Sequence, residues 1–105
     1  MKFIITESKL ESLIFKYLDN QDFITIEKED VVYFVNSTDD KYAQIRYDKN
    51  DGWCFIDINL VDEISSFFSL SHDDSKELIG KWVENTLQME VSNTMLLFIW
   101  NAEVS

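Results

Sequence analysis

His72 is the residue whose type is best suited to chemistry, because it is the only histidine and two carboxylates, Asp73 and Asp74, follow it directly. An imidazole beside carboxylates could transfer protons or share a metal ion with them. The same acids would also stabilise a helix N-terminus, with Ser71 as its cap. A site needs groups that converge from several elements, which one short run does not show. We therefore interpret His72 as an exposed loop residue beside a helix start and predict no catalytic residue.

Cys54 is the other reactive side chain, and as the single cysteine it can form neither an intramolecular disulfide nor a cysteine zinc cluster. It lies between Trp53 and Phe55, and the acidic surroundings disfavour a thiolate, so a core thiol is the simpler interpretation. The acidic run 48–52 resembles part of a calcium loop, but Gly52 stands at a ligand position and strand-like patterns flank it. With only two glycines, the chain also lacks a glycine-rich phosphate loop. No metal and no cofactor is expected.

The charge of the chain is more informative than any single residue, since 20 Asp and Glu oppose 9 Lys and Arg for a net charge of −11. Residues 50–105 hold ten acids and two bases, Lys76 and Lys81. Charge of this sign repels phosphate, so direct binding to nucleic acid or to an anionic membrane is not expected. Two interpretations stay open: a solubilising surface, or a patch that meets a basic partner, as a mimic of nucleic-acid phosphate would. The acids considered for such a patch are Asp57, Asp62, Glu63, Asp73 and Asp74.

Hydrophobic periodicity predicts the elements that carry these residues. Apolar residues at helical spacing predict a helix over residues 6–20, which begins either with Thr6 as its N-cap or two residues later with a capping box of Ser8 and Glu11. Strand-like runs come next, and their order predicts an antiparallel meander over residues 23–27, 31–35, 42–47 and 53–58. The turn-forming run 48–52 is a hairpin connection between the last two strands.

Helical spacing returns in the second half of the chain. Asn59 is the expected N-cap of a first helix, with Asp62 and Glu63 in its first turn. Ser71 and Asp74 form a capping box for a second helix. The predicted core joins the apolar stripes of the helices to one face of the strands. Its expected members are Leu13, Ile14, Phe34, Ile45, Phe55, Ile64, Phe68, Ile79 and Val83.

The run from Met95 to Trp100 is apolar and does not alternate, although it is too short to span a bilayer. A strand with one face in water should alternate, so both faces of this strand need cover. Either the chain's own sheet supplies the cover, or a second copy or partner does. We expect a homodimer, although a net charge of −11 opposes self-association. The expected interface residues are Met95, Leu97, Phe98, Ile99 and Trp100.

Three segments carry a similarity to a known family: residues 2–10 (KFIITESKL), 17–21 (YLDNQ) and 81–88 (KWVENTLQ). They resemble small proteins of tailed phages, especially marine phages, for which we know of no activity. The resemblance covers most of residues 1–94 and transfers no functional residue. It implies a viral origin and action inside a bacterial cell.

These features together predict one α+β domain over residues 1–105. It comprises an N-terminal helix, a four-stranded antiparallel meander, two helices packed on one face and a short C-terminal strand. The apolar start of the chain ends too early for a signal peptide, so a cytoplasmic location is expected. The expected function is non-enzymatic binding of another protein, as a small phage accessory or structural factor. The alternative is an acidic inhibitor that occupies the nucleic-acid site of a host enzyme.

Overall fold

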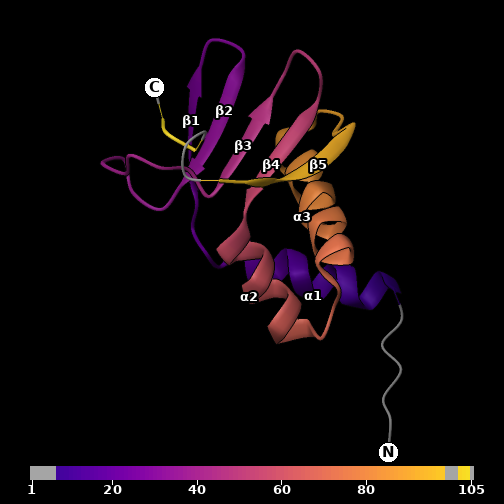
Figure 1. Cartoon of the computed structure of the whole chain (residues 1–105). Coiled ribbons are helices and arrows are strands. Elements are labelled where there is room, and N and C mark those ends of the chain that lie inside the picture. Colours follow the sequence, from indigo (N-terminus) through magenta and orange to yellow (C-terminus); the bar gives the residue numbers. More distant parts are fainter. Residues whose placement is uncertain (1–6, 99–101, 105) are drawn as a thin grey trace, which may run out of the picture.

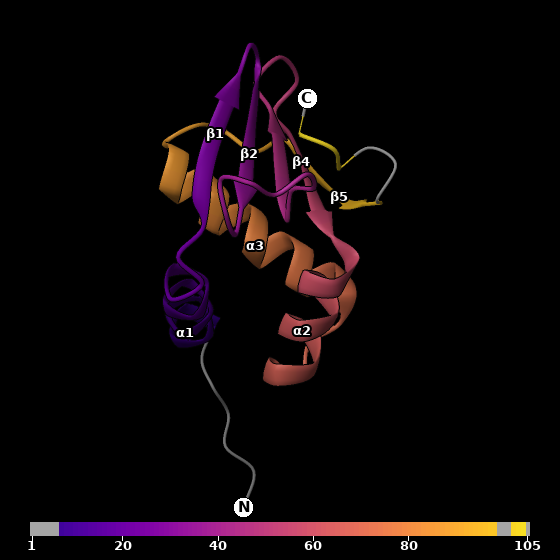
Figure 2. The same ribbon diagram turned by 90° about the vertical axis from the view of Figure 1, so that its left-hand side faces the viewer.

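Three helices pack on one face of a five-stranded sheet in the computed structural model, which describes residues 7–98 and 102–104. Figure 1 shows the strands rising above α1 and α2, and Figure 2 shows α3 running diagonally across the lower part of the sheet. The predicted α+β class is confirmed. The elements in chain order are α1 (Glu7–Asp19), β1 (Ile24–Lys28), β2 (Val31–Val35), β3 (Ile45–Asp48), β4 (Trp53–Asp57), α2 (Ile58–Phe68), α3 (His72–Leu87) and β5 (Asn93–Leu97).

Strands β1 to β4 form the predicted antiparallel meander, with each strand paired to the next along the chain. Strand β2 has the predicted bounds, and it is buried on both faces, as its continuous apolar sequence indicates. Strand β3 begins at Ile45, whereas the sequence predicted a start at residue 42. The reason is tertiary: the Ala43 N–H donates to the Ala102 carbonyl at 2.8 Å, and Tyr42 forms an isolated bridge with Glu103.

Strand β5 runs parallel to β4 and extends the sheet beyond the meander. It begins at Asn93, two residues before the predicted start, while the predicted end at Trp100 lies outside the described residues. The Ser92 N–H donates to the Gly52 carbonyl at 2.8 Å, which ties the start of β5 to the β3–β4 hairpin. Gly52 has a φ of 75°, a left-handed conformation that suits glycine and the predicted turn.

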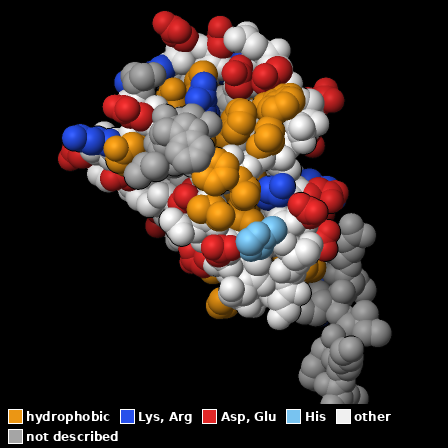
Figure 3. Space-filling model, in the orientation of Figure 1, with side chains coloured by type: hydrophobic (Ala, Val, Ile, Leu, Met, Phe, Trp, Pro, Cys, Tyr) orange, Lys and Arg blue, Asp and Glu red, His pale blue; other side chains and the backbone are white. Residues whose placement is uncertain are grey.

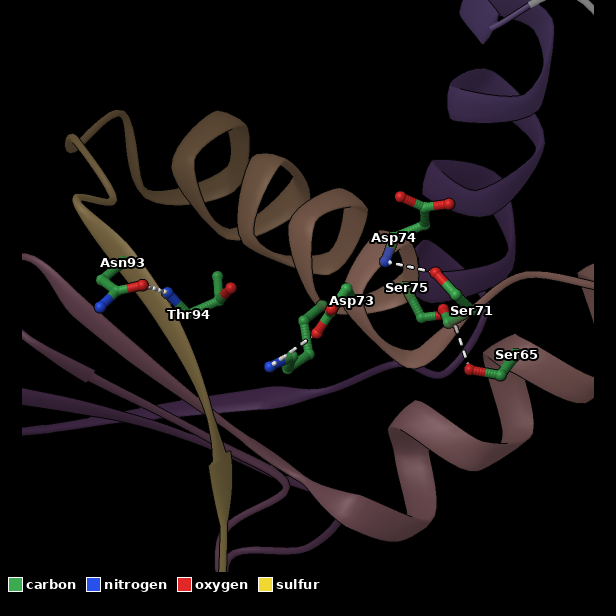
Figure 4. Close-up of polar contacts among 8 residues, drawn as sticks. Ser65, Ser71, Asp73, Asp74, Ser75, Asn93 and Thr94 are labelled. Atoms are coloured by element: carbon green, nitrogen blue, oxygen red, sulfur yellow. Dashed lines mark hydrogen bonds and ion pairs between the residues drawn. The ribbon is translucent and has the colours of Figure 1, made fainter.

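The start of α2 differs from the prediction. Asp57 occupies the N-cap position and Asn59 lies inside the helix, because the chain turns into the helix directly where β4 ends. Asp62 and Glu63 therefore lie beyond the first turn of α2. The start of α3 is as predicted, since the Ser71 hydroxyl accepts a hydrogen bond from the Asp74 N–H at 3.1 Å (Figure 4). No described helix is long and apolar enough to cross a bilayer.

The main core lies between the helices and the sheet. Of the predicted core residues, it contains Ile14, Phe34, Ile45, Ile64, Ile79 and Val83, with Phe68 partly buried against it. The prediction for Leu13 is wrong, because its side chain is 43% exposed while Ile14 and Leu18 face the core. Phe55 also departs from the prediction, since it packs against a smaller cluster on the opposite face of the sheet.

Tyr47 links the sheet to the segment that precedes β5. Its side chain is buried, and its hydroxyl donates a hydrogen bond to the Glu90 carbonyl at 2.7 Å. Burial is also the largest cause of the raised pKa of this phenol.

We expect Tyr47→Phe to lower the free energy of unfolding by about 1 kcal/mol, because it leaves the Glu90 carbonyl without this donor. Urea denaturation measures the change. Tyr42→Phe is the matched control, because Tyr42 is 44% exposed. Equal effects of the two substitutions would contradict a specific role for the Tyr47 hydroxyl.

Candidate binding surface

His72, Asp73 and Asp74 do not converge on one site, although they are adjacent in the sequence. His72 is the first residue of α3 rather than a loop residue, and its Nε2 lies 2.7 Å from Oδ1 of Asp62 on α2. Asp73 instead pairs with Lys76 at 3.4 Å (Figure 4). Within residues 7–98 and 102–104, no group of three or more His, Cys, Asp or Glu side chains is placed to hold a metal ion. The His72–Asp62 pair therefore connects two helices.

Cys54 lies in the main core on the helical side of β4, with 0% of its surface exposed. Burial raises the pKa of its thiol to about 12, so the thiolate form is strongly disfavoured at neutral pH. This arrangement agrees with a core residue and not with a nucleophile.

The five acids considered for an acidic patch have separate local roles on α2 and α3. Asp57 is the N-cap of α2, and Asp62 pairs with His72. Glu63 accepts a hydrogen bond from the Tyr17 hydroxyl, whose pKa is raised to about 12 by burial and by this carboxylate. Asp74 lies in the first turn of α3, as Asp73 does. Positions at helix starts and pairing within the chain thus involve all five of these acids.

The pKa of Asp57 is raised above the ordinary value of 3.8. Burial raises its pKa, Asp62 raises it further, and the N–H groups of Ile58 and Asn59 oppose the rise. Because the folded state holds this proton more tightly than the unfolded state, ionised Asp57 lowers stability above its folded pKa. That cost disappears as the pH falls through the folded pKa towards 3.8.

We expect Asp57→Asn to raise the melting temperature at pH 7, because asparagine caps a helix as well as aspartate does and carries no charge. The gain should shrink as the pH falls towards 4. Thermal unfolding of both proteins across this range measures the difference. A variant that is less stable at pH 7, with a deficit that vanishes at low pH, would show that the ionised carboxylate stabilises the fold.

The face of the sheet that points away from the helices, here called the outer face, carries a row of large side chains. The strand register places five residues side by side across this face: Ile26, Tyr33, Arg46, Phe55 and Met95. The C-terminal segment 102–104 covers the part above β2, where Tyr33 and Val35 are buried. The Val104 N–H holds this segment by donating to the Lys41 carbonyl at 2.8 Å.

The part of the outer face above β4 and β5 is less completely covered. Trp53 and Phe55 are half-buried, and Met95 is 40% exposed. The Trp53 and Phe55 rings lie 6.1 Å apart between centroids, and the Arg46 guanidinium lies 5.9 Å from the Phe55 ring centroid. We call Arg46, Trp53, Phe55 and Met95 the outer patch. Figure 3 looks onto this face and shows hydrophobic side chains gathered there, with acidic and basic side chains at their margin.

The sequence of β4 carries a signal for the outer patch. Trp53 and Phe55 alternate with the core residues Cys54 and Ile56, which is the pattern of a strand with two distinct faces. Of the predicted interface residues, Met95 belongs to the outer patch, and Leu97 is only 1% exposed because the smaller cluster buries it within the chain. Phe98 is 39% exposed, while Ile99 and Trp100 lie outside the described residues.

A second exposed apolar cluster lies on the helices. Phe67 of α2 is 69% exposed, and its ring lies 5.4 Å from that of Tyr17 and 5.0 Å from that of Phe68. Leu13 is exposed on α1. Tryptophan, tyrosine and arginine are the residue types that contribute most to binding energy in interfaces. Of these three, the cluster contains a tyrosine, Tyr17, but neither a tryptophan nor an arginine.

A surface groove of about 600 Å³ lies between α1 and α3. Three of its charged side chains are engaged within the chain: Lys81 lies 3.9 Å from Glu11, and Glu84 accepts a hydrogen bond from the Val91 N–H at 2.9 Å. The groove is lined by Glu11, Phe15, Lys81, Glu84, Asn85, Gln88, Met89 and Glu90. These residues bring no histidine, cysteine or serine to it, so the outer patch is the better candidate for a functional surface.

Comparison with known proteins adds no relative from which a role could be transferred. A scan against the models of known protein families finds no match, and searches of curated proteins and of solved structures find none either.

Proposed function

We propose that this protein is a non-enzymatic module that binds another protein through its outer patch. The observation that carries the proposal is the contact of Trp53, Phe55 and Arg46 on a partly uncovered sheet face. Tryptophan and arginine are the residue types most enriched among those that dominate interface energies, and aromatic residues and methionine are enriched at interfaces generally. The resemblance to tailed-phage proteins supports a role as a phage accessory or structural factor.

The rigidity of the outer patch also supports this proposal. Its backbone belongs to strands β3, β4 and β5, which are hydrogen-bonded side by side. A surface that is already ordered loses little conformational entropy when a partner binds. The binding free energy gained from burying Trp53 is therefore not offset by a large cost of ordering the backbone.

Capture of partners from a bacterial lysate tests the proposal when variants are compared in parallel. We expect Trp53→Ser and Met95→Ser each to lose a partner that the unaltered protein retains. Phe67→Ser should keep this partner, because Phe67 is exposed on α2 and lies outside the outer patch. Circular dichroism of the three variants establishes that they are folded.

Calorimetry with the purified partner measures how much affinity each variant loses. Truncation of a central tryptophan in an interface costs about 2 kcal/mol or more, so Trp53→Ser should weaken binding by about 30-fold. A partner lost with Phe67→Ser and retained with Trp53→Ser would contradict the proposal and assign the function to the helical cluster.

A further inference from the structure

We infer that the partner of the outer patch is a basic protein surface, with lysine or arginine side chains around an apolar centre. This inference rests on the proposed function, because it names the chemistry of the partner for the same surface. Four arguments support it: the charge around the patch, the aromatic stacking of Arg46, the partly buried carboxyl of Asp57, and the repulsion that a second copy would meet.

Strands β4 and β5, which form the exposed part of the outer patch, contain no base, and the one base of the patch is Arg46 on β3. Residues 50–75 and 82–105, which include β4, α2 and β5, have neither lysine nor arginine. Acids lie at both ends of β4, since Asp51 accepts a hydrogen bond from the Trp53 N–H at 2.9 Å and Asp57 ends the strand. Complementary charge at a rim steers association and selects the partner.

The aromatic rings of the outer patch also suit a cation. Arg46 already places its guanidinium over the Phe55 ring, at 5.9 Å from the centroid. Trp53 lies beside Phe55 and is partly exposed, and tryptophan is the aromatic residue that attracts cations most strongly. A lysine or arginine of the partner can therefore stack on Trp53 as Arg46 does on Phe55, with Asp51 nearby to balance its charge.

Asp57 gives a further reason for a basic partner. Its carboxyl is held in partly buried and acidic surroundings that raise its pKa. A cation brought next to this group would favour its ionised form and lower its pKa again. Binding of a basic surface would thus relieve an electrostatic cost that the free protein carries.

A second copy fits the outer patch less well than a basic partner does. A two-fold interface brings the same surface of each chain together, so it would place the acids at the two ends of β4 close to those of the other chain. Each chain also carries a net charge of −11. Like charges placed opposite each other in an interface are strongly unfavourable.

Two synthetic peptides of equal length test the charge of the partner, one of alternating lysine and leucine and one of alternating glutamate and leucine. We expect the lysine peptide to shift the amide NMR signals of β4 and β5 and to bind at least about tenfold more tightly than the glutamate peptide. Trp53→Ser, Met95→Ser and Asp51→Asn should each weaken it by several-fold. Glu11→Gln, which removes an acid from the groove between α1 and α3, and Phe67→Ser should leave the affinity unchanged.

The results separate failure of this inference from failure of the proposed function. If the glutamate peptide binds the outer patch as tightly, or if light scattering finds a dimer that Trp53→Ser dissociates, the basic partner is excluded while the outer patch remains a protein-binding surface. If the lysine peptide binds only outside the outer patch, and the lysate partner is unaffected by Trp53→Ser and Met95→Ser, both conclusions fail.

Discussion

Replacing Phe34 by alanine lowers the free energy of unfolding by about 3–5 kcal/mol, the expected cost of truncating a buried phenylalanine. Phe34 is 1% exposed at the centre of β2. Its ring lies 5.4 Å from that of Trp82 on α3 and 6.3 Å from that of Phe23, between centroids. The substitution therefore opens a cavity between the sheet and α3. Urea denaturation followed by circular dichroism measures the loss.

Phe67→Ala is the matched control, because it truncates a phenylalanine that is 69% exposed. We expect its effect to be within about 1 kcal/mol of zero, as for most surface substitutions. If Phe34→Ala cost no more than this control, Phe34 would not lie in a central strand, and the packing of α3 on the meander would have to be revised.

Gly80→Ala is expected to destabilise the protein by about 1–3 kcal/mol, through overpacking. Alanine is favoured over glycine inside a helix by about 1 kcal/mol, so helix propensity alone predicts the opposite sign. A Cβ at position 80 would lie 2.5 Å from Cγ2 of Thr94, which is too close for two carbon atoms. Steric overlap between α3 and β5 should outweigh the gain in propensity.

A double substitution tests this explanation. Serine at position 94 lacks the Cγ2 methyl, so Gly80→Ala combined with Thr94→Ser should recover most of the lost stability. The comparison with each single variant gives the coupling between the two positions. A Gly80→Ala variant that is more stable than the unaltered protein would show that α3 does not approach β5 this closely.

One strand, one helix cap and one turn were predicted correctly, because interactions between residues close together in the sequence determine them. The apolar run Val31–Val35 predicted a strand buried on both faces, and the structure has the same bounds. Ser71 caps α3 because its hydroxyl reaches the Asp74 N–H three residues away. The turn before Gly52 joins β3 to β4 as its residue types predicted.

The errors arise where distant parts of the chain decide the outcome. Strand β3 starts late because Ala43 pairs with Ala102, far away in the sequence. Asn59 does not cap α2, because β4 continues to Asp57 in its pairing with β5. Leu13 and Ile14 both belong to the apolar stripe of α1, and the placement of that helix decides which of them faces the core.

One residue of the candidate surface was expected at an interface, and its part in an interface stays a prediction. Met95 was expected at an interface, and the structure places it on the outer face opposite Phe55. Arg46 could not be assigned to the same surface from the sequence, because its contact with Phe55 depends on the register between β3 and β4. Charge counts predict an acidic second half, and the structure places two of its acids, Asp51 and Asp57, at the two ends of β4.

The parallel pairing of β5 with β4 has a consequence for the order in which the chain assembles. Strands β1 to β4 pair with their neighbours along the chain, whereas Asn93 pairs with Trp53 about forty residues earlier. Contacts between distant residues form slowly, because a long loop must close first. A nascent chain can therefore build the meander before the last strand is synthesised. Met95 joins the outer patch at the final step, so the surface is complete only on a finished molecule.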